Sequence, residues 1–303
     1  MKIEDYLSIV IATYNHCSLL ESTLQALLNS PVRDCRITVL DNKSTDGTCA
    51  LCREYSSKFK NLKIYTQPVN LGGGSPNYMH GIEFCDTEYI WHLADDDVYD
   101  FSHFEDVEEA IFSNKYNLIQ VGAHTEGDWN WGIEGTPREL YEKGYNYFRF
   151  SSFLPCDIFR FSYYTKYIYD AYLAISCSYP HMPSLIAAYK DDVCIYLSKY
   201  RIVKAVIGQQ TYASNVPIKG FILLSEKLDT KSDKRRCILS QLSCSIGDAY
   251  PRFLYHRRFP DTEEGRMLYR ILFKAASFTE KIKIILSYIP VKILGVISPY
   301  KGI

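Results

Sequence analysis

The stretch IWHLADDDVYD, residues 90–100, organises the rest of the sequence. It begins with a short apolar run of the length and composition typical of a buried strand. The run ends in three adjacent carboxylates, Asp95, Asp96 and Asp97, which repel one another and need solvent, a cation or both. Hard cations such as Mg²⁺ and Mn²⁺ take oxygen ligands, often one or two carboxylates plus substrate phosphates. The plain alternative is a solvated acidic turn that caps the following helix.

Strands and helices alternate upstream of this stretch. Residues 7–12 (LSIVIA) predict a buried strand, and leucines at helical spacing follow until Pro31. A second strand, residues 36–40, ends in Asp41, and a third is expected at residues 62–65. This order predicts right-handed β-α-β units and a mainly parallel sheet with helices on both faces. Because ligands bind beyond the carboxyl ends of such strands, Asp41 and the acidic triplet are expected at one site.

A glycine run, Gly72-Gly73-Gly74, precedes the acidic strand. It is neither a G-x-G-x-x-G fingerprint directly after the first strand nor a G-x-x-x-x-G-K phosphate loop. The alternative that the run is only a flexible loop therefore stays open. Glycine does allow backbone N–H groups to approach a phosphate closely, with the N-terminus of the following helix nearby.

Composition and charge set the broad class. The 303 residues, 47% of them hydrophobic, are enough to bury a sizeable core. Residues 1–120 carry 9 Lys and Arg against 18 Asp and Glu, a net charge of −9, whereas residues 219–303 carry 16 against 8, a net charge of +8. The ten cysteines are scattered rather than arranged as a disulfide framework, and the Cys49–Cys52 pair lacks the second pair that a zinc site would need. The first apolar run is too short for a signal peptide. We therefore expect the protein in a reducing cytoplasm.

Four segments in order, LSIVIATYN, VLDNKSTDGT, NLGGGSPNYMHGIE and YIWHLADDDVYD, resemble the nucleotide-binding half of inverting family 2 glycosyltransferases. The resemblance covers roughly residues 6–125. It implies the GT-A fold, an α/β Rossmann-like architecture, here with a helical C-terminal extension. It also implies a nucleoside-diphosphate sugar as donor and Mn²⁺ or Mg²⁺ as cofactor.

The resemblance assigns roles to individual positions. Asp41 maps to the aspartate that contacts the nucleoside base, and Asp95, Asp96 and Asp97 map to the D-x-D motif that holds the metal on the diphosphate. One departure is that the family's Arg-Asn in the glycine segment reads Pro76-Asn77 here. The full set expected to bind the nucleotide-sugar comprises Ala12, Thr13, Tyr14, Asn15, Asp41, Asn70, Gly72, Gly73, Asn77, Asp95 and Asp96.

The second half holds the candidates for a general base. Between Tyr141 and Tyr172 lie thirteen Tyr or Phe, which suit sugar rings but equally an aromatic core. Asp157 within this region is either an acceptor-site carboxylate or a turn residue. Residues 171–189 contain no charged side chain, and prolines at their middle predict two helices joined by a turn rather than a membrane span.

That turn, Tyr179-Pro180-His181, stands where family members usually carry an acidic pair that includes the catalytic base. The pattern resembles the abequosyltransferase-like branch, which decorates bacterial surface polysaccharides. His181 is therefore the first candidate for the base, although a lone histidine is often structural. Asp157 and Asp191 are the rivals, and Asp191-Asp192 fits the exposed end of the second helix.

The tail from residue 252 alternates basic and apolar residues. Leu268, Ile271, Leu272 and Ala275 share one helical face, and residues 280–303 contain no uncharged run longer than eight residues. Two interpretations stay open: the segment lies on an anionic membrane surface, or it packs against the rest of the chain.

Together these features predict a metal-dependent glycosyltransferase with a saccharide or lipid-linked saccharide acceptor. We expect no nucleic acid partner and a cytoplasmic location, which becomes peripheral on the inner face of the plasma membrane if the tail binds an anionic lipid surface. The expected divisions are a donor half (1–125), an acceptor half (126–218) and a basic extension (219–303). A sugar-nucleotide nucleotidyltransferase and a non-catalytic sugar-nucleotide-binding subunit are the alternatives.

Overall fold

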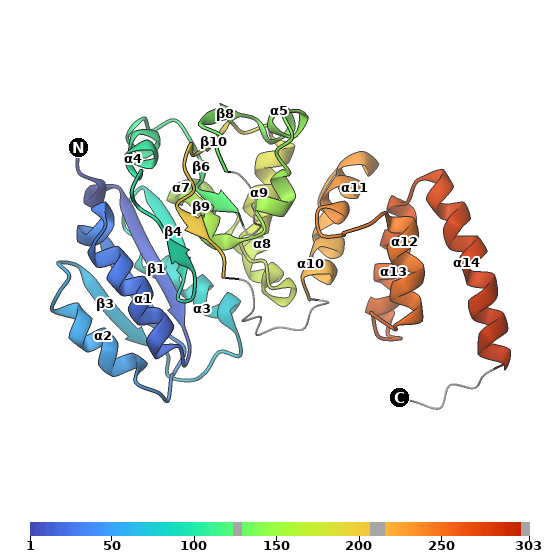
Figure 1. Cartoon of the computed structure of the whole chain (residues 1–303), viewed down its shortest axis with the longest axis horizontal. Coiled ribbons are helices and arrows are strands. Elements are labelled where there is room, and N and C mark those ends of the chain that lie inside the picture. Colours follow the sequence, from blue (N-terminus) through green and yellow to red (C-terminus); the bar gives the residue numbers. More distant parts are fainter. Residues whose placement is uncertain (124–128, 207–215, 298–303) are drawn as a thin grey trace. The chain divides into compact units, whose positions relative to one another are not determined.

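The structure, a computed structural model, describes residues 1–123, 129–206 and 216–297. The chain forms two compact units, Met1–Gln209 and Gln210–Ile303 (Figure 1). The first unit contains all the strands among the described residues, and the helices of the second unit are α10 to α14.

A mixed sheet of eight strands lies at the centre of the first unit. Strands β3, β2, β1 and β4 run parallel, whereas β9 is antiparallel to both β4 and β6. The strands in spatial order are β3 (Leu62–Thr66), β2 (Arg36–Asp41), β1 (Leu7–Thr13), β4 (Tyr89–Ala94), β9 (Asp157–Arg160), β6 (Leu118–Gln120), β10 (Ile195–Leu197) and β8 (Ile133–Gly135). A second, three-stranded sheet joins β5 (Val98–Tyr99), β11 (Val203–Lys204) and β7 (Gly122–Ala123).

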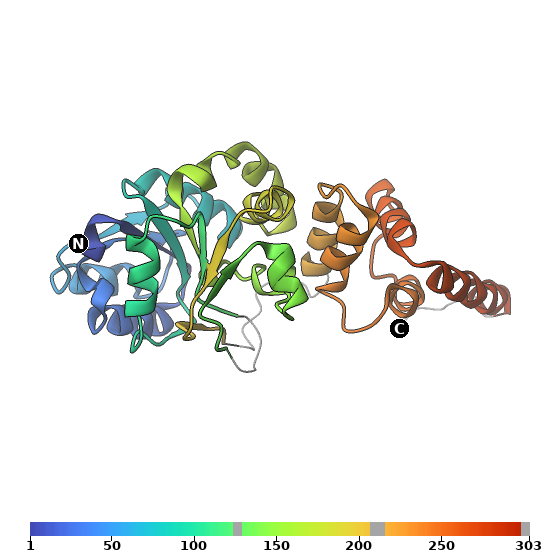
Figure 2. The ribbon, with the colours of Figure 1, turned by 90° about the horizontal axis from the view of Figure 1, so that it is seen from above.

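Helices cover both faces of the large sheet (Figure 2). The apolar side chains of α1, α2 and α4 share one core with Ile9, Ile11 and Trp91 from the central strands. On the opposite face α3 lies close to the sheet, because a Cβ on Gly81 would come within 2.4 Å of Val10. Coverage on both sides explains why all seven residues of β1 are buried.

The predicted α/β fold is confirmed. The helices of the first unit are α1 (Cys17–Leu28), α2 (Thr48–Ser56), α3 (Gly74–Gly81), α4 (Glu105–Phe112), α5 (Pro137–Glu142), α6 (Tyr147–Phe150), α7 (Phe161–Thr165), α8 (Ile168–Leu173) and α9 (Met182–Lys190). Short 3-10 turns cover residues 3–5, 31–34, 82–84, 154–156 and 174–177. The predicted turn at residues 179–181 therefore lies directly before α9.

The second unit is entirely helical in its described part. Its helices are α10 (Val216–Ser225), α11 (Lys231–Leu239), α12 (Ile246–Tyr255), α13 (Glu263–Ala275) and α14 (Phe278–Ile297). Leu268, Ile271, Leu272 and Ala275 are all buried in its core, as the spacing predicted. Within the described residues, no helix has the length and apolar character needed to cross a bilayer.

Candidate active site

Three neighbouring strands deliver the predicted site residues to one edge of the sheet. Thr13 at the end of β1 lies beside Asp41 at the end of β2, and Ala12 pairs with Ala94 at the end of β4. Asp95 follows Ala94 directly. The register therefore brings Asp41 and the acidic triplet to the carboxyl edge, where the sequence predicted a ligand site.

Asp41 is fully buried, and its carboxylate has two neighbours. Oδ1 accepts the backbone N–H of Ser44 at 2.9 Å, and Oδ2 accepts the thiol of Cys49 at 3.1 Å. These bonds join the end of β2 to its turn and to α2. Each carboxylate oxygen keeps further lone pairs, so a base contact by Asp41 stays a prediction.

The turn after β1 is tied to the turn after β2. Asn15 adopts a left-handed conformation with φ 54°, which asparagine tolerates better than most residues. Its N–H donates to Ser44 Oγ at 2.8 Å, and its Oδ1 accepts the N–H of Thr45 at 2.8 Å. Tyr14, the residue before Asn15 in the turn, is exposed. An apolar ring and polar groups thus line the same edge.

The glycine segment is held by an asparagine pair. Asn42 Oδ1 accepts the N–H of Leu71, and Asn70 Oδ1 accepts the N–H of Gly72, both at 2.8 Å. Gly72 has φ 80°, a conformation that suits glycine, and Gly72 and Gly73 are exposed immediately before α3. Asn70 therefore shapes this loop from within.

Asn77 differs from the rest of the predicted set because its side chain is buried beneath the loop. Its Nδ2 donates to the carbonyl of Leu40 at 2.7 Å, and its Oδ1 accepts from Gln67 at 2.9 Å. These bonds fasten α3 to the sheet. A direct contact between Asn77 and the nucleotide remains untested.

The three aspartates of the triplet have different surroundings. Asp95 is buried, and both its oxygens lie 3.1 Å from His16 Nδ1, while its carbonyl accepts from Thr23 on α1. Asp97 Oδ1 accepts the N–H of Val206 at 3.2 Å, but its buried Oδ2 has no partner among the described residues. Asp96 is half-buried, and no hydrogen bond joins it to another described side chain.

The electrostatics of the triplet reflect this crowding. Burial, then the charges of Asp96 and Asp95, raise the pKa of Asp97 to about 7. Burial and the charge of Asp95 also raise the pKa of Asp96. In return, the hydrogen bond to Asp95 raises the pKa of His16. The negative charge at this strand end is therefore only partly compensated by the chain itself.

The residues fit a divalent cation in one respect. Within the described ranges, no three His, Cys, Asp or Glu side chains converge as a ready-made metal site. A hard cation bound with a substrate diphosphate, however, needs only one or two carboxylates from the protein. The unpartnered Oδ2 of Asp97 and the open carboxylate of Asp96 are oxygen donors of that kind.

Asp157, a candidate base, begins β9 and is completely buried. Its Oδ1 accepts from Gln120 Nε2 at 2.7 Å, and its Oδ2 has no partner among the described residues. Burial raises the pKa of Asp157 well above its ordinary value, against the opposing effect of the Gln120 bond. Burial thus favours the protonated form of this carboxyl, which cannot accept a proton.

His181, directly before α9, is also buried. Its Nε2 lies 3.1 Å from the carbonyl oxygen of Ser151, which can only accept, so Nε2 carries the proton. Nδ1 keeps its lone pair and has no partner among the described residues. Burial lowers the pKa of His181 to about 4, although bonds to Ser151 and Ser152 oppose this effect.

Asp191 and Asp192 occupy the exposed C-terminal end of α9. Asp192 forms an ion pair with Arg138 at 3.2 Å. The thirteen aromatic residues divide in a similar way: Tyr145, Tyr147 and Tyr164 are buried, as a core requires, and a minority are exposed. Asp157 and His181 are therefore enclosed by the fold, whereas Asp191 lies at the surface.

Three polar residues of this region were not singled out in the sequence. Gln120 ends β6 and links Asp157 to Ser151 Oγ, which it contacts at 2.6 Å. His92 on β4 is buried, and neither ring nitrogen has a partner among the described residues. His16 contacts Asp95 from α1's N-terminal end. Only His16 had a signal in the sequence, its position next to the Thr13–Asn15 turn.

The sheet, with acidic residues at its carboxyl edge, has the arrangement of the GT-A fold. Residues 8–173, more than half of the chain, match Glycosyl transferase family 2, and the protein belongs to that family.

Two relatives are named by their activities. The chain is 33% identical over 93 residues to a poly(ribitol-phosphate) beta-glucosyltransferase of Bacillus spizizenii, covering 30% of this chain and 15% of the relative. It is 26% identical over 91 residues to a GalNAc(5)-diNAcBac-PP-undecaprenol beta-1,3-glucosyltransferase of Campylobacter jejuni, covering 30% and 29%. The chain thus matches less than a third of the length of either relative.

Solved structures show the same fold over most of the chain. TarS 1–349 of S. aureus in complex with UDP-GlcNAc has a TM-score of 0.65 at 14% identity and covers 93% of this chain and 89% of its own. Mannosyltransferase PcManGT from Pyrobaculum calidifontis, in complex with GDP-Man and Mn²⁺, has a TM-score of 0.55 at 10% identity, with coverages of 92% and 86%.

Proposed function

We propose that the protein is a metal-dependent, inverting glycosyltransferase that acts in the synthesis of a bacterial surface polysaccharide. Its donor is a nucleoside-diphosphate sugar, and its acceptor is a hydroxyl of a saccharide or lipid-linked saccharide. The observation that carries this proposal is the convergence of Asp41 and the acidic triplet on one sheet edge in a family 2 chain. The relatives named as a poly(ribitol-phosphate) beta-glucosyltransferase and a GalNAc(5)-diNAcBac-PP-undecaprenol beta-1,3-glucosyltransferase support the acceptor class.

The donor-binding site lies in residues 1–125, and the acceptor-binding site lies in residues 126–218. Asp41 and the exposed ring of Tyr14 contact the nucleoside, and the exposed backbone at Gly72 and Gly73, directly before the N-terminus of α3, faces the diphosphate. When bound by Asp96 and Asp97, with Asp95 beside them, Mn²⁺ or Mg²⁺ supplies Lewis-acid stabilisation of the departing diphosphate. The complexes of structural neighbours with UDP-GlcNAc and with GDP-Man and Mn²⁺ support this assignment.

His181 is the general base of the proposed reaction. The acceptor oxygen forms a bond to the anomeric carbon as the bond from that carbon to the diphosphate oxygen breaks. The acceptor proton passes to His181 Nδ1, the nitrogen that the Ser151 contact leaves unprotonated. One displacement on one carbon inverts its configuration. Asp157 and then Asp191 are the next candidates, but the first has a raised pKa and the second is exposed.

The Tyr179-Pro180-His181 turn supports a place near the abequosyltransferase-like branch of the family. A lipid-linked acceptor would place the enzyme in the cytoplasm, peripheral on the inner face of the plasma membrane. The fold alone does not select the donor sugar, because structural neighbours with the same fold bind UDP-GlcNAc in one case and GDP-Man in another. A binding screen identifies the donor.

A binding screen tests the proposal. Nucleoside-diphosphate sugars are added to the full chain with and without Mn²⁺, and thermal unfolding and titration calorimetry are recorded. We expect one nucleotide class to stabilise the protein, and to do so more strongly with Mn²⁺. The preferred donor is then incubated with saccharide acceptors, and NMR of the product determines the anomeric configuration. Retention of configuration, or Mn²⁺-independent binding of every donor, would contradict the proposal.

A further inference from the structure

Helix α14 presents apolar side chains on two opposite sides. On its inner side, Ile284 is buried in the core of the helical unit, and Glu280 binds Arg235 of α11. On its outer side lie Phe278, Ile282, Ile285 and Leu286, which we call the outer stripe. Their exposed fractions are 77%, 43%, 55% and 61%. The spacing i, i+4, i+7 and i+8 places all four on one helical face.

The orientation of this face is determined by the inner contacts. Glu280 Oε1 accepts from Arg235 at 3.0 Å, and Oε2 accepts the N–H of Ser277, which precedes the helix, at 2.7 Å. Lys283 bonds to Asp248 of α12. Because these bonds hold the inner side against α11 and α12, the outer stripe cannot turn inward without breaking them.

The charge of the surroundings identifies what covers the stripe. Residues 219–303 carry 16 Lys and Arg against 8 Asp and Glu, and exposed cations include Arg266, Arg270 and Lys274 of α13. Two copies with this charge would repel each other, which disfavours a symmetric contact between copies of the chain. An apolar helix face in a unit with an excess of cations matches a surface with anionic headgroups over acyl chains.

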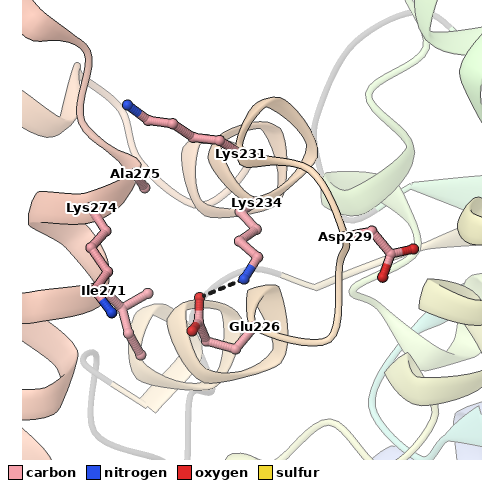
Figure 3. A pocket seen from close by; sticks show the side chains of 7 residues that line it. All are labelled: Glu226, Asp229, Lys231, Lys234, Ile271, Lys274 and Ala275. Atoms are coloured by element: carbon pink, nitrogen blue, oxygen red, sulfur yellow. Dashed lines mark hydrogen bonds and ion pairs between the residues drawn. The ribbon is translucent and has the colours of Figure 1, made fainter.

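The cations are spread over the unit rather than gathered around one anion. A pocket of about 330 Å³ is lined by Lys231, Lys234 and Lys274 together with Glu226. Lys234 is paired with Glu226 at 3.1 Å, and Lys231 and Lys274 point in different directions (Figure 3). A single phosphate would need converging donors, whereas a lipid surface is satisfied by distributed charge.

We propose that the outer stripe of α14 docks on an anionic lipid surface, with the helix lying in the headgroup plane. Phe278 and Ile282 enter the acyl boundary together with Ile285 and Leu286, and the cations of the unit contact the headgroups. This inference does not depend on the sugar donor, the metal or the base, because vesicle binding is measured without any of them.

Flotation of the full chain with vesicles tests the inference. Vesicles of phosphatidylcholine alone are compared with vesicles that also contain phosphatidylglycerol, at low salt and at high salt. The variant Ile282→Ser/Ile285→Ser/Leu286→Ser keeps the net charge, and we expect it to lower partitioning to anionic vesicles by about tenfold or more. The matched control Val69→Ser changes an equally exposed residue of the other unit and should leave binding unchanged.

Two further variants separate the contributions. Arg270→Gln/Lys274→Gln should weaken binding at low salt, where screening is least, and have a smaller effect at high salt. Phe278→Trp reports insertion directly, because its emission should shift to shorter wavelength and be quenched by brominated acyl chains. This readout holds even if the triple variant folds poorly.

Three outcomes would overturn the inference. The wild type does not float with anionic vesicles at low salt, or the triple variant floats as well as the wild type. In the third outcome the wild type is a dimer in gel filtration that the triple variant converts to a monomer, which would make a second copy the occupant.

Discussion

The Nε2 of His181 lies 3.1 Å from the carbonyl oxygen of Ser151, and the Oγ of the same serine lies 2.6 Å from Gln120 Nε2. Gln120 in turn donates to Asp157 at 2.7 Å. Ser151 and Gln120 thus connect the two buried candidate bases, His181 and Asp157. The contact also determines which nitrogen of His181 can accept a proton, because a carbonyl oxygen only accepts.

Replacing His181 tests its role as the base. His181→Ala should lower the rate of transfer by about 10²–10⁴ and leave donor affinity nearly unchanged, because a positioned base contributes that much. His103→Ala, at an exposed histidine, is the control. Rates come from product formation at saturating donor. Transfer by His181→Ala within a few-fold of the wild type would assign the base elsewhere, first to Asp157.

The pH profile follows from the lowered pKa of His181. With a pKa of about 4, the imidazole is neutral and able to accept a proton throughout the neutral range. At saturating Mn²⁺ and donor, which keep the carboxyl of Asp97 ionised, we expect the transfer rate to stay level from neutral pH down to about pH 5 and to fall only as His181 becomes protonated near its pKa. A descending limb near the ordinary imidazole value of about 6.5 would mean that His181 is not buried in the working enzyme.

His92 makes a second pH prediction, concerning stability. Burial, then the nearby His181, lower its pKa to about 3, whereas the unfolded chain has the ordinary value of 6.5. Between these values the unfolded state binds a proton that the native state does not, so stability falls as pH falls from about 6.5. Each pKa unit corresponds to about 1.4 kcal/mol, so the loss amounts to several kcal/mol near pH 4.

The variant His92→Phe should remove this pH dependence. A phenyl ring keeps an aromatic partner for Tyr78 and Tyr164, whose ring centroids lie 5.7 and 5.8 Å from that of the imidazole. We expect the free energy of unfolding, from denaturant titrations at pH 7.5 and pH 5, to differ less between the two pH values than in the wild type. An unchanged difference would assign the acid sensitivity to other groups, such as His181.

Much of the fold was readable from sequence because local patterns and burial agree. LSIVIA and Arg36 to Leu40 are apolar runs between turn signals, and both are strands. The edge position of Asp41 followed from the parallel order alone. The antiparallel strand β9 was not predicted, because Asp157–Arg160 is too short to show a period, and its pairing depends on distant strands.

The site was only partly readable for a related reason. Three adjacent carboxylates are easy to recognise in a sequence, but the sequence does not tell which of Asp95, Asp96 and Asp97 is occupied by contacts within the protein. That depends on His16 and Val206, 79 and 109 residues away. Gln120 likewise becomes notable only when β6 and β9 pair and bring it beside Asp157.

The triplet gives a prediction for metal-dependent binding. Asp96→Asn and Asp97→Asn should each weaken Mn²⁺-dependent donor binding, because each removes charge from a carboxylate with an open oxygen. Asp95→Asn should weaken it as well, by disturbing its neighbours and its contact with His16. Asp100→Asn, at an exposed residue directly after β5, is the control. If all three triplet variants bound the donor and Mn²⁺ with the same calorimetric affinity as the wild type, the triplet would be excluded from the metal site.

Asp41 has a structural role in its turn and a predicted role in nucleotide binding, and binding measurements with two ligands distinguish these roles. Asp41→Asn should weaken nucleotide binding far more than binding of Mn²⁺-pyrophosphate, because only the nucleotide carries a base. Cys49→Ser keeps a hydrogen-bond donor for Oδ2 and serves as the control. Equal losses for both ligands, together with a lower unfolding temperature, would assign Asp41 to the turn alone.

The last prediction concerns Ser151 as a positioning residue for His181. Ser151→Ala removes the Oγ that accepts from Gln120 but keeps the carbonyl that accepts from His181. Losing a partner for a buried amide should cost about 1–3 kcal/mol of stability. If that bond holds the Ser151 backbone in place, the transfer rate should also fall, with donor affinity unchanged.

A spectroscopic readout distinguishes positioning from a purely structural role. The ¹⁵N shifts of the His181 ring report which nitrogen is protonated, and the wild type should show the Nε2–H form. In Ser151→Ala we expect a mixture of the two tautomers, whereas Ser151→Thr, which keeps the hydroxyl, should restore the wild-type shifts. Ring shifts that are identical in Ser151→Ala and the wild type, with a lower unfolding temperature, would show that the serine hydroxyl stabilises the fold and does not orient the base.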